Sequence, residues 1–205
     1  MTPEILQNRR YFTPVWELDH AALGPALKPW VLRRTGLSAV YVMLSLVAGA
    51  LVAWHGVGAH LDLLRVLIYT CLGVTAGFLL LLPLHEWVHA LVYRSSGASE
   101  VAVRYQWRTL SAYCVADQFV LGGAAFELVC MAPLLMLTPP LALGALLLSG
   151  SWALVCTGAL LVHLAACSGD VALINWIGLH ERERLWTYDD VKAGKSYFFA
   201  QHAQP

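Results

Sequence analysis

Residues 66–93, VLIYTCLGVTAGFLLLLPLHEWVHALVY, are the stretch that decides the fold. Residues 66–83 carry no charged side chain. With the residues that follow, they are long enough to cross the hydrocarbon core of a bilayer as one helix. Two histidines and a glutamate then appear together at the end of this apolar run. Because ionisable side chains are costly inside a membrane, their presence there indicates a functional site.

The polar residues are arranged as His85-Glu86-Trp87-Val88-His89. On a helix the two imidazoles lie one turn apart on the same face, with Cα atoms about 6 Å apart, which suits two ligands of one tetrahedral zinc ion. Glu86 is turned about 100° from His85 and is placed to act on a water molecule as a general base. The alternative is a polar cluster that reaches toward solvent from a helix end. We favour the zinc site.

The composition indicates a membrane protein. The chain of 205 residues is 59% hydrophobic and only 13% charged, and its mean hydropathy is +0.62. Soluble domains are nearer 45–50% apolar and about 25% charged. The formal net charge is zero, so there is no basic surface to suggest a nucleic-acid partner. The five cysteines show no paired spacing, and we expect them to pack as small apolar residues rather than to bind the metal.

Four apolar runs predict an all-α membrane protein with about four transmembrane helices. The third and fourth are expected to be separated by a tight turn at Thr138-Pro139-Pro140, because a proline pair lacks the donors that a helix needs. A further apolar run, residues 171–179, is too short to span a bilayer by itself. The predicted spans are residues 36–54, 66–93, 119–137 and 141–167.

Basic residues predict the orientation of these helices. Twelve of the 13 Lys and Arg residues fall in the N-terminal segment, in the segment between the second and third spans, or in the C-terminal tail. Cytoplasmic segments carry the excess of basic residues, so we expect a multi-pass protein of the cytoplasmic membrane with both termini and residues 94–118 in the cytoplasm. The expected division is a cytoplasmic segment (1–35), a membrane-embedded core (36–180) and a cytoplasmic tail (181–205).

The segment between the second and third spans shows partial alternation of apolar residues. Val101, Val103, Tyr105 and Trp107 are spaced two apart, which predicts a short β-hairpin-like element on the cytoplasmic side. An exposed strand edge there would pair with an extended substrate peptide. The alternative is a hairpin that only connects two helices.

A catalytic zinc ion usually has three protein ligands, so the sequence should supply a third. Asp170 is the first choice, because it follows the fourth span at its cytoplasmic end, at the depth predicted for His85 and His89. Glu127 and His163 lie roughly 10 Å deeper in the third and fourth spans, where they would hydrogen-bond inside the bundle or line a water path. Asn175 is a candidate for positioning a substrate carbonyl or a metal ligand.

With these motifs the chain resembles the site-2 protease class of intramembrane zinc metalloproteases. Within that class it is similar to a small "putative zincin peptidase" family of unknown function. The resemblance covers about residues 36–180 and includes Ala132-Pro133 and Ser168-Gly169-Asp170 beside the His-Glu-x-x-His motif. It implies His85, His89 and Asp170 as zinc ligands and Glu86 as general base. Unlike site-2 proteases, the chain has Gly169 before Asp170 and Val171 after it, with no nearby proline.

These observations favour a zinc-dependent intramembrane endopeptidase. Its substrates would be membrane proteins with a locally unwound transmembrane segment, because a regular helix hides its amides. The alternative is a non-catalytic metal-binding membrane protein, either a pseudoprotease or a metal carrier. A pseudoprotease is expected to lack the general base, whereas Glu86 is present. A carrier should show acidic and histidine residues along several spans, and only Glu127 and His163 fit that description.

Overall fold

The computed structural model describes residues 1–106, 111–180 and 184–202. The chain forms two compact units, each built from segments distant in sequence. One unit contains Met1–Arg33, Trp87–Ala132 and Gly169–Pro205, and the other contains Arg34–Glu86 and Pro133–Ser168.

The stretch around the histidine motif is one uninterrupted helical segment of 33 residues, Leu63–Ser95. It consists of α4 (Leu63–Ala76), a π-helical turn (Gly77–Leu81) and α5 (Leu82–Ser95). The Asp62 side chain begins it by accepting a hydrogen bond from the backbone N–H of Arg65. The π-helical turn ends two residues before Pro83, and a wider turn makes room for a proline ring without ending the helix. The helix predicted for the second span is therefore confirmed.

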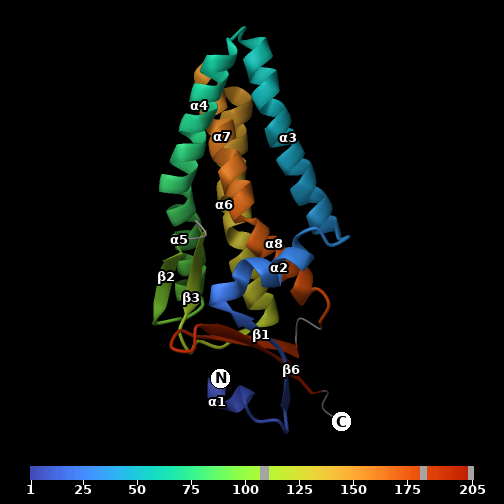
Figure 1. Ribbon diagram of the computed structural model, residues 1–205. Coiled ribbons are helices and arrows are strands. Elements are labelled where there is room, and N and C mark those ends of the chain that lie inside the picture. The colour runs from blue at the N-terminus through green and yellow to red at the C-terminus, as the bar shows by residue number, and fades with distance from the viewer. Residues whose placement is uncertain (107–110, 181–183, 203–205) are drawn as a thin grey trace. The chain divides into compact units, whose positions relative to one another are not determined.

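In the second unit, α7 (Gly150–Ala166) lies between α4 and α3 (Gly36–Gly58) (Figure 1). Glycines allow the close approach of α4 and α7. A Cβ atom on Gly73 would lie 2.1 Å from the carbonyl oxygen of Val155, and one on Gly158 would lie 2.4 Å from that of Thr70. The two backbones are therefore in direct contact, as is common where helices pack inside membranes.

The predicted turn at Pro139-Pro140 is wrong. Helix α6 extends through both prolines as Gly123–Leu147, and the chain turns only at Leu148 and Ser149. Gly150 follows with a φ of +60°, a conformation that favours glycine. The physical reason is the environment expected for a transmembrane helix. A loop inside hydrocarbon would leave several backbone groups without hydrogen bonds, whereas each proline in a helix removes only one backbone hydrogen bond.

The first unit contains a four-stranded antiparallel sheet that the all-α prediction did not include. Its strand order is β1-β6-β5-β4, and it joins the N-terminal segment to the C-terminal tail (Figure 1). Phe198 is fully buried on this sheet and packs against the rings of Trp16, Trp176 and Phe126. The strands are β1 (Phe12–Asp19), β4 (Leu121–Gly122), β5 (Leu185–Asp190) and β6 (Lys195–Gln201).

The predicted hairpin after the second span is confirmed. Strands β2 (Val101–Gln106) and β3 (Ser111–Ala116) pair in antiparallel register, with Val101 opposite Ala116. Trp107, which the sequence also assigned to a strand, lies outside the described residues. The first unit also contains α1 (Pro3–Leu6), a 3-10 turn (His20–Ala22), α2 (Leu23–Val31) and α8 (Ser168–Ile177).

Four helical segments in the described part of the chain are long and apolar enough to cross a membrane. This confirms the number of predicted spans, and the protein is multi-pass by helix length and composition. The segments are Gly36–Gly58, Leu63–Ser95, Gly123–Leu147 and Gly150–Ile177. The cytoplasmic location of the termini stays a prediction.

Candidate metal centre

The His-Glu-x-x-His motif lies within α5, as the sequence predicts, and its polar side chains are buried. His85, Glu86 and His89 expose only 2%, 4% and 6% of their surface. Trp87, on the other side of the same helical turn, is 68% exposed. The motif therefore presents its three ionisable side chains to the protein interior and its tryptophan to the surroundings, which include lipid if α5 crosses a membrane.

The ring of His89 is fixed from one side by a backbone carbonyl. Its Nδ1 lies 2.9 Å from the carbonyl oxygen of Val129 in α6. Because a carbonyl oxygen only accepts, Nδ1 carries the proton and donates it. The other ring nitrogen, Nε2, is then an electron-pair donor in the neutral imidazole. Metal-ligating histidines are commonly held in this way, with the second nitrogen bonded to a carbonyl that sets the tautomer.

The Nε2 atom of His89 faces the carboxylate of Asp170. The separation between Nε2 and Oδ1 is 3.3 Å, and both side chains are buried. Asp170 stands in the first turn of α8, where the partial positive charge of a helix N-terminus favours a carboxylate. The chain therefore brings together two of the residues that the sequence proposed as ligands, although they are 81 positions apart.

The spacing and chemistry of this pair fit a zinc ion. Two nitrogen or oxygen ligands of one tetrahedral zinc ion lie about 3.4 Å apart, given bond lengths of about 2.0–2.2 Å. A neutral imidazole nitrogen and a carboxylate oxygen repel each other at 3.3 Å unless a cation or a proton lies between them. His85 comes one turn before His89 on the same continuous helix, so it is placed to act as the next donor.

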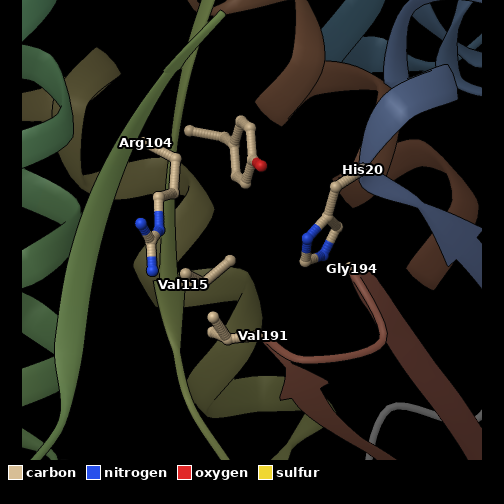
Figure 2. A pocket seen from close by; sticks show the side chains of 6 residues that line it. His20, Arg104, Val115, Val191 and Gly194 are labelled. Atoms are coloured by element: carbon tan, nitrogen blue, oxygen red, sulfur yellow. The ribbon is translucent and has the colours of Figure 1, made fainter.

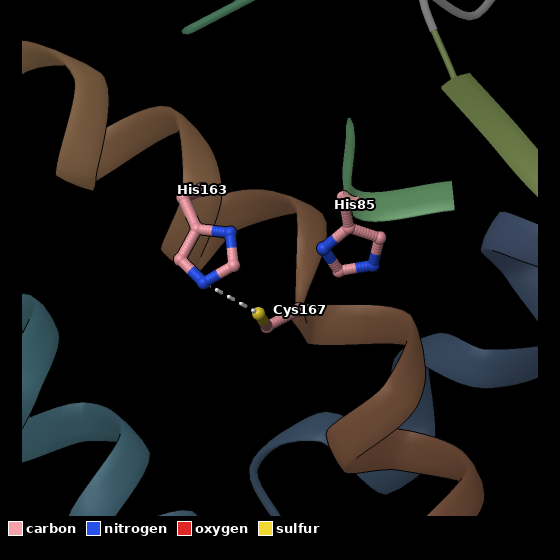
Figure 3. A group of neighbouring side chains, drawn as sticks. All are labelled: His85, His163 and Cys167. Atoms are coloured by element: carbon pink, nitrogen blue, oxygen red, sulfur yellow. Dashed lines mark hydrogen bonds between the residues drawn. The ribbon is translucent and has the colours of Figure 1, made fainter. Parts of the chain in front are cut away.

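His163 and Cys167 occupy successive turns at the end of α7, and His85 lies beside them in the second unit (Figure 3). The ring centroids of His85 and His163 are 5.6 Å apart. The Nε2 atom of His163 lies 3.1 Å from the hydroxyl oxygen of Thr138 and 3.6 Å from the sulfur of Cys167. The sequence prediction that His163 takes part in polar contacts inside the bundle is consistent with these distances.

The remaining predicted site residues have different surroundings. Asn175 donates a hydrogen bond from Nδ2 to the backbone carbonyl of Trp30, 2.8 Å away, and so attaches α8 to the end of α2. Glu127 is half-buried in α6, two residues before Val129, whose carbonyl holds His89. The predicted role of Glu127, in a hydrogen bond inside the bundle or along a water path, stays a prediction. So does the predicted role of Asn175 in positioning a substrate carbonyl or a metal ligand.

A second polar cluster, which the sequence did not reveal, lies in the first unit. The hydroxyl of Ser196 donates to a carboxylate oxygen of Asp189 at 2.6 Å, and His20 Nε2 lies 2.9 Å from the same hydroxyl oxygen. Burial raises the pKa of Asp189 to about 6, and the carboxylate of Asp117 adds to this rise. Burial lowers the pKa of His20. No local sequence pattern indicates this cluster, because the three residues come from two separate strands and a turn.

A cavity of about 310 Å³ opens beside His20. Arg104 and His20 face it from opposite sides (Figure 2). Its lining residues are His20, Arg104, Tyr113, Val115, Val191 and Gly194, all in the first unit.

The comparisons with known proteins agree with the motif. A family model described as "Putative zincin peptidase" matches residues 78–182, about half of the chain, and this range includes His85, Glu86, His89 and Asp170. No curated protein and no solved structure matches the chain.

Proposed function

The chain belongs to the "Putative zincin peptidase" family, and from this membership and the metal-binding geometry we propose that it is a zinc-dependent intramembrane endopeptidase of the site-2 protease type. In this proposal His85, His89 and Asp170 hold the zinc ion and Glu86 is the general base. The substrates are peptide bonds in or near the transmembrane segments of membrane proteins.

One observation carries most of the proposal. His89 is held by the Val129 carbonyl so that its Nε2 atom faces the Asp170 carboxylate at 3.3 Å. A structural ion pair would need an imidazolium, which is costly to bury. A divalent cation satisfies both donors at the observed spacing without a second proton on the ring of His89.

Hydrolysis of a peptide bond requires a Lewis acid and a base. A bound zinc ion would be the Lewis acid, lowering the pKa of water and polarising the scissile carbonyl. Glu86 takes the proton from the attacking water and afterwards gives it to the leaving amine, so the peptide bond is replaced by a carboxylate and an amine. Its burial keeps this carboxylate away from bulk water and beside the ligand histidines.

The position of the motif in its helix supports access to water and substrate. His85 and His89 come after the long apolar run and close to the end of the segment Leu63–Ser95. With residues 94–118 in the cytoplasm, they would lie near the cytoplasmic boundary of the bilayer. The hairpin of β2 and β3 directly follows α5, so an unwound substrate segment could add a strand to its edge.

The second candidate is a non-catalytic metal-binding membrane protein, such as a pseudoprotease or a metal carrier. This candidate explains the histidines and Asp170 but gives no role to Glu86. Glu86 directly follows the first proposed ligand, which is the position of the general base in His-Glu-x-x-His metallopeptidases, so its presence favours the peptidase.

The decisive experiment is Glu86→Gln in the purified full-length protein. We expect the same zinc content as in the wild type and loss of cleavage of a transmembrane reporter by at least about 100-fold, because the base is lost and the ligands remain. Glu100→Gln, at an exposed site outside the motif, makes the same chemical change and should keep full activity. Equal cleavage by Glu86→Gln and the wild type would refute the mechanism, and absence of cleavage by a zinc-loaded wild type would favour the non-catalytic candidate.

A further inference from the structure

Three metal-binding side chains in the second unit form a group of their own. His85, His163 and Cys167 each place one possible ligand atom within 4.8 Å of the other two, and all three side chains are buried (Figure 3). His163 and Cys167 stand one turn apart on the last turns before α8. This differs from the packing role that the sequence predicts for Cys167.

The distance between the side chains of His163 and Cys167 is the one that a shared tetrahedral ion requires. The Nε2 atom of His163 lies 3.6 Å from the sulfur of Cys167. With bond lengths of about 2.3 Å to sulfur and about 2.0–2.1 Å to nitrogen, two such ligands of one zinc ion lie about 3.6 Å apart. A backbone spacing of four residues on a helix places both side chains on one face, so no rearrangement of α7 is needed.

The chemistry of the group favours a thiophilic cation. A thiolate and two neutral imidazoles form a Cys-His-His donor set, which suits Zn²⁺ and its spectroscopic substitutes Co²⁺ and Cd²⁺ rather than Mg²⁺ or Ca²⁺. Thr138 lies 3.1 Å from the same nitrogen of His163, so its hydroxyl holds the ring in the metal-free protein and has to give way when an ion binds.

We propose that His85, His163 and Cys167 form a second metal-binding site, which takes a thiophilic divalent cation with Cys167 as the thiolate ligand. On binding, the thiol loses its proton to solvent as the metal–sulfur bond forms, so one proton is released for each ion bound. The site shares His85 with the proposed catalytic ligands, but it does not require peptidase activity and can be tested without it.

The test is a titration of the metal-free full-length protein with Co²⁺, because a thiolate ligand gives a charge-transfer absorption band in the near ultraviolet that nitrogen and oxygen ligands do not give. We expect the band to grow and saturate in the wild type and to disappear in Cys167→Ser. Cys156→Ser, a matched change in the same helix outside the group, should keep the band. Asp170→Asn should also keep it, because Asp170 is not a member of this group.

A measurement on the wild type covers the case in which Cys167→Ser fails to fold. X-ray absorption at the zinc edge should then show a sulfur shell at about 2.3 Å. The absence of the cobalt band and of a sulfur shell in the wild type would overturn the proposal, as would a band that persists in Cys167→Ser. Loss of the cobalt band with normal cleavage in Cys167→Ser would confirm this site and would be compatible with the peptidase proposal. The cobalt band therefore tests the second metal site, and cleavage of the reporter tests the peptidase proposal.

Discussion

Replacing Asp189 with asparagine should change how the stability of the first unit depends on pH. The Asp189 carboxylate is buried, and its two oxygens accept hydrogen bonds from the Ser196 hydroxyl and from the backbone N–H of Ala116. Burial nevertheless raises its pKa from 3.8 to about 6, so burial outweighs these two bonds. The folded protein therefore holds a proton on Asp189 at a pH where the unfolded chain has lost it.

The sign and the size follow from this difference. Between about pH 4 and pH 6 the folded state binds more protons than the unfolded state, so the free energy of unfolding falls as the pH rises. A pKa change from 3.8 to about 6 corresponds to about 3 kcal/mol. Asn resembles the protonated carboxyl, so Asp189→Asn should stabilise the protein by up to about 3 kcal/mol above pH 6 and by little below pH 4. His20 contributes with the opposite sign, because burial lowers its pKa and stability is lost as the pH falls through 6.5.

The assay is chemical unfolding in detergent at pH 4, 5, 6 and 7, followed by tryptophan fluorescence. Trp16 and Trp176 pack against Phe198 in this unit and so report on its unfolding. Asp190→Asn, one residue further along, should keep the wild-type pH dependence because Asp189 is intact. If the wild type and Asp189→Asn show the same change of stability with pH, Asp189 is not the titrating group and the reasoning is wrong.

Three further predictions concern the helices and the metal. Gly73→Ala should destabilise the protein by about 1–3 kcal/mol in thermal unfolding, because the new Cβ would lie 2.1 Å from the Val155 carbonyl oxygen. Gly49→Ala, where a Cβ meets no atom within 4 Å, should leave the unfolding temperature unchanged. His89→Ala should lower the zinc content by about one ion per chain relative to the wild type in metal analysis, and His85→Ala by at least as much, because His85 belongs to both proposed sites. A variant with the zinc content of the wild type would show that its histidine is not a ligand. A cysteine placed at Ser96 should be labelled from the cytoplasm, and labelling from outside would overturn the predicted orientation.

The parts of the fold that depend on local composition could be predicted from the sequence. Four long apolar runs gave the number of spans, because a bilayer requires about 20 apolar residues whatever the neighbours are. Alternation in residues 101–105 gave the hairpin, which forms between segments close in sequence. The position of His85, Glu86 and His89 on one helix also followed from local spacing alone.

The parts that depend on distant pairing could not be predicted. In the sheet, Phe12 pairs with Gln201 across almost the whole chain, and no local pattern shows which segment a strand will meet. The wrong prediction of a turn at Pro139-Pro140 has another cause. The helix-breaking tendency of proline is known from soluble proteins, in which water can hydrogen-bond the backbone of a loop, whereas hydrocarbon cannot. The approach of Asp170 to His89 could be suggested by depth, yet the 3.3 Å contact required the structure.

The most direct test of the central claim is a crystal structure of the zinc-loaded protein with anomalous scattering measured at the zinc edge. We expect a zinc ion bonded to His85, His89 and Asp170, with the Asp170 oxygen at about 2.0–2.2 Å from the metal. A zinc ion that is bound by the two histidines but lies more than about 4 Å from the Asp170 carboxylate would show that Asp170 is not a ligand and would make Glu127 the next candidate for the third ligand.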